Sequence, residues 1–240
     1  MDLTKALRAT AIKSPILVIA PHPDDETLGC GGLIAMVSSE GQPLHVVFVT
    51  DGGASHPNSR EWSRQRLSGR RETEAAEALG RLGAGHQPRT FLRLRDADMP
   101  QPESSAYAEA MGDLVTIIRD LQPRLVVLPW RRDPHCDHQA SWQLAMDAIA
   151  AANLSSETWE YAIWLDAFGR PEDRPRPGEM KEVRLEIASA LAAKRHAIEA
   201  HRSQLGKLVV DDPSGFVLDR GTIARLSGSE EVYWRPCAAR

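Results

Sequence analysis

The feature that most constrains the fold is a series of short apolar runs separated by segments with helical periodicity. The runs are rich in Val, Ile and Leu, which is typical of strands covered on both faces. They are Pro15–Ala20, Leu44–Thr50, Thr90–Leu94 and Leu125–Pro129. Between them, Leu28–Ser39, Arg71–Leu82 and Tyr107–Leu121 place apolar side chains at helical spacing. Strands that alternate with helices predict an α/β fold: a Rossmann-like, doubly wound, mostly parallel sheet with helices on both faces.

The later part of the chain is predicted to complete the same sheet. We expect a fifth strand at Trp159–Trp164, a long helix at Glu182–Gln204 and a last edge strand at VYWRP, residues 232–236. The Pro- and Arg-rich stretch Gly169–Met180 is the one clear break in composition, and it predicts a surface loop rather than a linker. We therefore expect residues 1–240 to form a single domain, long enough to bury a core without disulfides.

Composition and charge narrow the classes of function. The 29 basic residues against 33 acidic residues give a net charge of −4, so no general attraction to nucleic acid is expected. The 3 cysteines are far apart and form no CxxC pair, which favours a reducing compartment, and we expect a cytoplasmic protein. No segment approaches the roughly 20 apolar residues that span a bilayer, so stable membrane insertion is not expected.

Acidic residues crowd the end of the first apolar run, in the stretch APHPDDETLGCGG. Like charges placed together there are costly unless a cation lies among them. His22 and Asp25 can both face one ion where the chain leaves a strand, at the edge where doubly wound sheets bind ligands. The alternative is that Asp24, Asp25 and Glu26 simply cap the helix that follows, where acids interact well with the helix dipole.

A second polar cluster, RRDPHCDHQA, follows the apolar run LVVLPW. It places His135 and His138 at the end of another predicted strand. If the two strand ends meet at the switch point of the sheet, His22, Asp25 and His138 offer nitrogen and oxygen ligands with a fourth position open to water. That pattern is typical of a catalytic rather than a structural zinc site, and it leaves His135 free.

These two motifs resemble those of the LmbE-like, or PIG-L-type, N-acetylglucosaminyl deacetylases. The motifs read PHPDDE at Pro21–Glu26 and HCDH at His135–His138, with Cys136 where the family usually has proline. Four further stretches are similar to family segments: TDGGAS at Thr50–Ser55, RETEAAEALGRLG at Arg71–Gly83, LRDADM at Leu94–Met99 and KRHAIEAHRSQL at Lys194–Leu205. They follow the order of the family and cover most of the chain.

The resemblance implies a metal-dependent hydrolase that removes an N-acetyl or other N-acyl group from a small amino sugar or a glycoconjugate. His22, Asp25 and His138 would hold the metal, which is expected to be zinc, with another divalent metal as the alternative. Asp24 resembles the general base of the family and would take a proton from the attacking water.

The resemblance also implies roles for residues around the metal. His135, kept cationic by neighbours such as Asp137, would stabilise the oxyanion and hand a proton to the departing amine. Arg71 and Asp96 would bind substrate hydroxyls. Relatives often assemble into oligomers, so a homo-oligomer is a further expectation.

Two other classes of protein stay open on the sequence. Gly29, Gly31 and Gly32 open a helix after a strand, as in sites that cradle a dinucleotide or methyl-donor cofactor, although the G-x-G-x-x-G spacing is absent. The chain could then be a Rossmann-type cofactor-binding transferase. A non-catalytic sugar-binding protein on the same fold is the second alternative, although Asp24 and the metal ligands are all in place. Most tryptophans are expected in the core, and Trp130 has the best position to reach a pocket.

Overall fold

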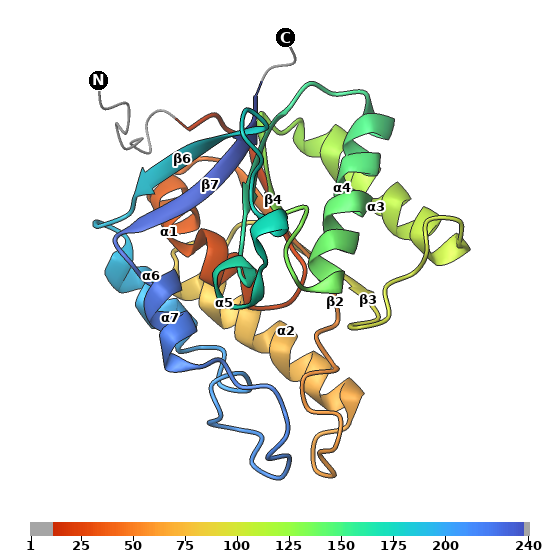
Figure 1. The fold of residues 1–240 in the computed structure, drawn as a ribbon, viewed down its shortest axis with the longest axis vertical. Coiled ribbons are helices and arrows are strands. Elements are labelled where there is room, and N and C mark those ends of the chain that lie inside the picture. The colour runs from red at the N-terminus through yellow and green to blue at the C-terminus, as the bar shows by residue number, and fades with distance from the viewer. Residues whose placement is uncertain (1–11, 238–240) are drawn as a thin grey trace.

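Seven strands form one sheet in the computed structural model, which describes residues 12–237 (Figure 1). The strands are β1 (Ile16–Ala20), β2 (Leu44–Thr50), β3 (Arg89–Leu94), β4 (Leu125–Pro129), β5 (Glu157–Tyr161), β6 (Met180–Glu186) and β7 (Glu230–Pro236). Their order is β3-β2-β1-β4-β5-β7-β6; the first five are parallel, whereas β7 runs antiparallel to both β5 and β6. The predicted doubly wound, mostly parallel sheet is confirmed, with its switch point between β1 and β4.

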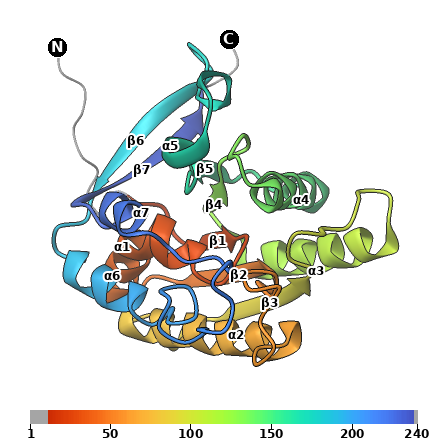
Figure 2. The same cartoon turned by 60° about the horizontal axis from the view of Figure 1, so that its bottom comes forward.

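Helices cover both faces of this sheet. They are α1 (Asp25–Ser39), α2 (Arg64–Arg81), α3 (Ser105–Leu121), α4 (Cys136–Ala152), α5 (Leu165–Phe168), α6 (Leu191–Ile198) and α7 (Arg220–Leu226), with a short 3-10 turn at Pro171–Asp173. One core lies between the sheet and α1, α2 and α6, and the other lies beneath α3 and α4 (Figure 2). None of the helices in residues 12–237 has both the length and the apolar character that a membrane crossing requires.

The division of β1 between the two cores explains why its sequence is apolar throughout. Ile16, Val18 and Ala20 belong to the core beside α1, whereas Leu17 and Ile19 belong to the core beneath α3 and α4. Alternate side chains of a strand point to opposite faces, so a strand covered on both sides has no polar position. The strand ends at Ala20, and the polar residues of the first motif follow directly.

The helix predicted at Glu182–Gln204 is wrong over its first part, which forms β6; the shorter helix α6 follows after a turn. Val183 and Leu185 are buried while the positions around them are more exposed, which is the two-residue period of a strand. Charged residues between these apolar positions resemble the solvent face of a helix. The continuous antiparallel pairing of β6 with β7 decides the outcome, and that pairing is distant in sequence.

Smaller differences concern the boundaries of three other elements. The fifth strand begins and ends earlier than Trp159–Trp164, and α2 begins at Arg64 rather than at Arg71. The last strand, expected at the edge of the sheet, lies between β5 and β6, and β6 is the edge. The segment Gly169–Met180 is mostly exposed and largely outside helices and strands, as predicted.

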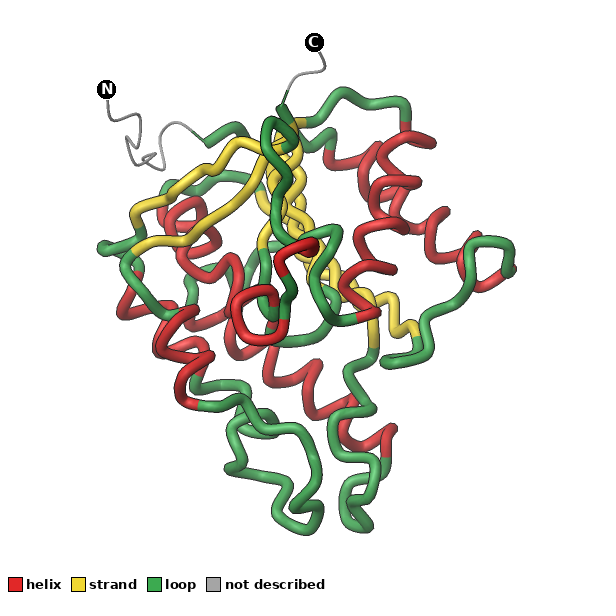
Figure 3. Tube along the Cα trace, in the orientation of Figure 1, coloured by secondary structure: helices red, strands yellow, loops and turns green. Residues whose placement is uncertain are grey.

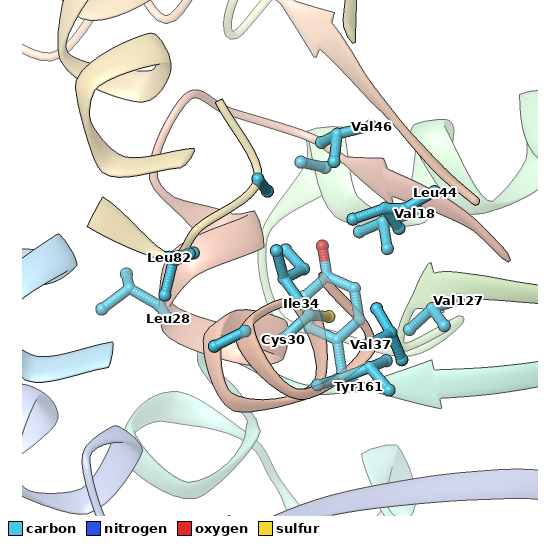
Figure 4. Packing of buried hydrophobic residues seen from close by; sticks show 14 of the residues in the cluster. Val18, Leu28, Cys30, Ile34, Val37, Leu44, Val46, Leu82, Val127 and Tyr161 are labelled. Atoms are coloured by element: carbon cyan, nitrogen blue, oxygen red, sulfur yellow. The ribbon is translucent and has the colours of Figure 1, made fainter. Parts of the chain in front are cut away.

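The glycines of α1 allow the helix to pack closely against its neighbours. A Cβ atom at Gly29 would lie 2.6 Å from Cε2 of Tyr161, and one at Gly32 would lie 2.7 Å from Cβ of Ile187. In Figure 4 the Tyr161 ring lies against α1, close to Cys30, inside the first core. Side chains therefore occupy the space above these glycines, so close packing accounts for the GCGG sequence without a cofactor.

A buried ion pair fastens the β6–β7 strand pair to α1. One carboxylate oxygen of Glu231 accepts from the Lys194 ammonium at 2.6 Å and from the Gly32 N–H at 2.7 Å. The other oxygen accepts from the Leu33 N–H at 2.9 Å and from the Tyr233 hydroxyl at 2.7 Å. Both charged side chains are buried. Because Glu231 is fully partnered, its charge is compensated only while Lys194 is present.

Replacement of Lys194 is therefore expected to destabilise the protein strongly. Lys194→Met leaves Glu231 buried without its counter-charge, which should lower the free energy of unfolding by about 3–5 kcal/mol. The control is Arg184→Met, which breaks exposed ion pairs with Glu182 and Glu230 on the same two strands and should cost less than about 1 kcal/mol. Chemical denaturation measures both; equal losses would contradict the structural role of Lys194.

Candidate active site

The two polar clusters of the sequence meet at the carboxyl edge of the sheet. β1 leads into the first motif and β4 leads into the second, and these two strands pair in parallel. The clusters border a cavity of about 660 Å³. Its lining includes six of the seven site residues predicted from the sequence: His22, Asp24, Asp25, Arg71, Asp96 and His135. The seventh, His138, is not part of the lining and lies buried against Asp25, which is.

His22, Asp25 and His138 form a compact buried group. Each offers a ligand atom within 4.8 Å of the other two. One oxygen of Asp25 lies 3.1 Å from Nδ1 of His22 and 3.2 Å from Nε2 of His138. The His138 ring is fully buried, and neither of its nitrogens has a hydrogen-bond partner within the described chain. Two imidazoles and a carboxylate with such an orphaned nitrogen fit a divalent metal.

Nearby carboxylates favour the charged form of both histidines in this group. Burial lowers the pKa of His138, but Asp25 and Asp133 outweigh it and raise that pKa to about 9. Burial likewise lowers the pKa of His22, and hydrogen bonds with Asp137 and Asp25 raise it well above its usual value. A ligand nitrogen must be unprotonated, so binding of a metal here requires the histidines to lose these protons. The positive charge of the metal would then balance the carboxylates in their place.

Asp137 is a member of the site that sequence analysis treated only as a neighbour of His135. Its Oδ2 lies 3.1 Å from Nε2 of His22 and accepts from the Ala97 N–H at 2.8 Å. With His22 and His135, it also forms a second group of ligand atoms within 4.8 Å of one another. Asp137 therefore joins the start of α4 to the loop after β3 and holds His22 between them.

Asp133 has a similar role on the other side of the site. Its Oδ1 lies 3.5 Å from Nδ1 of His138 and accepts from the His135 N–H at 3.1 Å. Its Oδ2 accepts from the backbone N–H groups of Ile163 and Trp164, at 3.1 and 3.0 Å. A carboxylate on the far nitrogen of a ligand histidine fixes the orientation of the ring. Its place two residues before His135 is a sequence signal for this role.

Asp24 points toward Arg71 rather than toward the start of the helix. Its Oδ2 accepts from Nη2 of Arg71 at 3.0 Å, and its side chain makes no cap hydrogen bond among the described residues. The capping alternative is thus wrong for Asp24, although Glu26 does accept from the Asp24 N–H at 3.0 Å. Burial raises the pKa of Asp24 to about 6, even though Arg71 lowers it. A carboxylate with such a pKa is suited to accept a proton near neutrality.

Arg71 and Asp96 both line the cavity and both have partners inside the protein. Besides Asp24, the Arg71 guanidinium donates to the carbonyl oxygens of Gly52 and Pro23, at 2.8 and 3.1 Å. Asp96 accepts from the Ala54 N–H at 2.8 Å. The contacts of Arg71 make it a residue that positions Asp24, and its binding of substrate hydroxyls stays a prediction, as does that of Asp96.

His135 caps the start of α4 and borders the cavity, and its ring centroid lies 4.7 Å from that of His22. The expected cationic state is wrong. Burial lowers the pKa of His135, and His22 and His138 lower it further, to about 4, despite the opposing effect of Asp137. Nδ1 accepts from the Asp137 N–H at 3.2 Å, so the proton of the neutral ring is assigned to Nε2. The ring is therefore a neutral donor.

The expected position of Trp130 at the pocket is also wrong. Its ring is fully buried, packs against Trp234 at 5.0 Å and donates to the Asp173 carbonyl at 2.8 Å. A different tryptophan, Trp164, lines the cavity. Sequence analysis assigned no site role to the other large side chains of this lining, namely Leu28, Pro134, Trp164, Phe168, Gln204 and Phe216.

Comparisons with known proteins place this site in a family. Residues 17–149 match the PIG-L family, described as GlcNAc-PI de-N-acetylase. The 1D-myo-inositol 2-acetamido-2-deoxy-alpha-D-glucopyranoside deacetylase of Rhodococcus opacus (strain B4) is 31% identical over 241 residues, covering 79% of this chain and 81% of the relative. The corresponding deacetylase of Rhodococcus jostii (strain RHA1) is 30% identical, with the same coverage of both chains.

Solved structures agree with the sequence comparison. An N,N'-diacetylchitobiose deacetylase from Pyrococcus horikoshii, complexed with an inhibitor, matches with a TM-score of 0.63 and 27% identity, covering 79% of this chain and 70% of that one. A 4-carboxy-2-hydroxymuconate hydratase from Pseudomonas putida KT2440 matches with a TM-score of 0.64 at 20% identity, covering 95% and 97%; it shows the shared fold alone. Since the family match spans more than half of the chain and includes both metal-site motifs, the chain belongs to the PIG-L family of de-N-acetylases.

Proposed function

We propose that this protein is a metal-dependent hydrolase that removes an N-acetyl or other N-acyl group from a small amino sugar or glycoconjugate. The observation that carries the proposal is the position of Asp24, which borders the same cavity as the buried group of His22, Asp25 and His138. Relatives named as deacetylases of acetamido sugars support the substrate class. Zinc is our proposed metal because two histidines and one carboxylate are a common catalytic zinc ligand set, with another divalent metal as the alternative.

Asp24 is proposed to act as the general base. The chemistry that a bound divalent metal supplies is Lewis acidity, which lowers the pKa of water and polarises an amide carbonyl. Oδ2 of Asp24 is engaged by Arg71, so Oδ1 is the atom left to accept a proton from the attacking water. The protonated carboxyl group can then deliver that proton to the departing amine, a role for which we first considered His135.

His135 is proposed to stabilise the negative charge that develops on the carbonyl oxygen. A neutral ring with its proton on Nε2 can donate one hydrogen bond to this oxygen without a formal charge of its own. Arg71 is proposed to act mainly by holding Asp24, and Asp96 to accept a hydrogen bond from a substrate hydroxyl. The first proposal follows from the hydrogen bond of Arg71 to Asp24, and the second from the place of Asp96 in the lining of the cavity.

A cytoplasmic location and a homo-oligomeric state are also proposed. Cys30, Cys136 and Cys237 are free thiols, which fits a reducing compartment. Gel filtration with light scattering tests the assembly.

The reaction class is tested by incubating the metal-reconstituted protein with a panel of N-acyl amino sugars. Hydrolysis of the amide releases a primary amine and a carboxylic acid in equal amounts, and both are measured by chromatography with mass detection. A hydratase, the activity named for the Pseudomonas putida protein, adds water without cleaving an amide and would release neither product. A panel in which no amine appears would overturn the proposed function.

We expect Asp24 to act as the general base and Asp25 to act as a metal ligand. Asp24→Asn should retain metal but lose about 10²–10⁴-fold in kcat, because an amide of nearly the same shape cannot accept the proton of water. Asp25→Asn is the matched control and should instead lower the metal content. Elemental analysis and steady-state kinetics on both variants make the comparison; opposite behaviour of the pair would reverse the two assignments.

The ligand role of His138 is tested beside that of His135. Wild-type protein purified without chelator should contain about one zinc-like ion per chain, and His138→Ala should lose most of it. His135→Ala should retain the metal and lose about 10²–10³-fold in kcat, the size associated with removal of one oxyanion donor. Full metal content in His138→Ala would exclude that residue from the ligand set.

A further inference from the structure

Three aromatic side chains line the cavity beside the polar site residues. They are Trp164, Phe168 and Phe216, which we call the aromatic wall. The Trp164 ring centroid lies 5.7 Å from that of Phe168 and 5.6 Å from that of Phe216, the second pair in an edge-to-face arrangement. Trp164 thus joins two phenylalanines that lie far apart in the sequence into one apolar surface.

The aromatic wall is unusually open to solvent for such large apolar side chains. Phe168 is 69% exposed and Phe216 is 38% exposed. Within residues 12–237, the exposed large apolar side chains are these two with Val210 and Val217. Half of them therefore line the cavity that borders the proposed metal ligands His22, Asp25 and His138, which we call the metal group. Exposed apolar side chains that gather at a cavity mark a binding surface, because leaving them in water costs free energy.

Backbone hydrogen bonds fix the aromatic wall relative to the metal group. The Trp164 N–H donates at 3.0 Å to Asp133, the carboxylate beside His138. The Phe216 N–H donates at 2.7 Å to the carbonyl oxygen of Ser55, another residue of the cavity lining. The backbone at Trp164 and at Phe216 is therefore held at a set position beside the site.

The loop that carries Phe216 is held along its length as well. In Figure 1 the blue loop before α7 runs beside the orange loop before α2, and Figure 3 shows both as loops. Asp211 accepts from the Ser59 hydroxyl and from the N–H groups of Arg60 and Glu61, at 2.7, 2.7 and 3.0 Å. Asp212 accepts from a further N–H of the same segment, that of Asn58, at 2.9 Å. A wall held in this way is preorganised for a ligand.

The chemistry of the wall differs from that of the cavity floor. The floor carries charged groups and hydrogen-bonding atoms, which suit an amide and sugar hydroxyls. The two phenylalanines have no hydrogen-bonding atoms, so they cannot satisfy a hydroxyl group that is brought against them. A sugar ring stacks its C–H face on a single aromatic ring. The three rings of the wall therefore offer more apolar surface than one sugar ring can cover.

We propose that the aromatic wall binds an aryl or alkyl group that the amino-sugar substrate carries in addition to its reacting amide. This inference rests on the proposed de-N-acylase function and specifies its substrate. The apolar group can be attached in two ways, as the aglycone on the anomeric oxygen or as a long acyl chain on the nitrogen. Both attachments present the same chemistry to the wall.

The test compares three substrates: N-acetylglucosamine, its benzyl glycoside and N-hexanoylglucosamine. Wild-type kcat/KM should be about ten- to a hundredfold higher for one of the two apolar substrates than for N-acetylglucosamine, and the preferred one identifies the attachment. The double variant Phe168→Ser/Phe216→Ser should remove most of this preference, mainly through KM. Val210→Ser, which removes an exposed apolar side chain outside the cavity lining, is the matched control and should leave the preference intact.

Calorimetric titration supplies a second readout that does not depend on turnover. Benzyl 2-amino-2-deoxyglucoside, the product of the aglycone arm, and hexanoate, the product of the acyl arm, are compared with glucosamine and acetate. Tighter binding of one apolar product, with a negative heat-capacity change that the double variant loses, supports the proposal. The proposed role of the wall is overturned if kcat/KM is equal for all three substrates in both the wild type and the double variant, and all products bind equally. That outcome leaves the de-N-acylase function intact. Failure to release amine from every substrate overturns that function, and product binding then still decides the role of the wall.

Discussion

Buried negative charge at the carboxyl edge of the sheet is the constraint on which the rest of the site depends. Five aspartates, Asp24, Asp25, Asp96, Asp133 and Asp137, are buried around His22 and His138. Carboxylates packed at this density and out of water need positive charge among them. Arg71 supplies it to Asp24 and the histidines supply it to the others, which is why each carboxylate faces a particular partner. The same demand makes the group receptive to a divalent cation.

This balance also gives different partners to two carboxylates that are adjacent in the sequence. Asp25 faces the histidines, whereas Asp24 faces Arg71, and its unusual backbone angle of φ 155° turns it away from its neighbour. Residues held in such sparsely populated conformations often occur at functional sites. The glycines that follow serve packing against Tyr161 and Ile187, so the cofactor-binding transferase has lost the feature that favoured it.

The sequence predicts the parallel part of the fold and the metal group, because both are encoded locally. Strands buried on two faces must be apolar throughout, and ligands must follow where those strands end. By contrast, β6 was predicted as a helix because its pairing with β7 joins distant segments. The charge state of His135 also differs from the prediction. Asp137 raises its pKa from two residues away in the sequence, but burial and the approach of His22, which lower the pKa together with His138, arise only in the folded protein. Phe216 reaches the cavity by a loop contact with Ser55 that no periodicity reveals.

The backbone anchoring of the aromatic wall separates the residues proposed to set specificity from those proposed to carry the chemistry. Trp164 and Phe216 are held through their main-chain N–H groups, which every amino acid except proline possesses. Side chains at these two positions can therefore be exchanged while α5 and the loop before α7 keep their course. The metal group lies on the strand ends and the first turns of α1 and α4, on separate segments of the chain. Substitutions in the wall can therefore change which groups the cavity accepts without displacing the residues proposed to hold the metal.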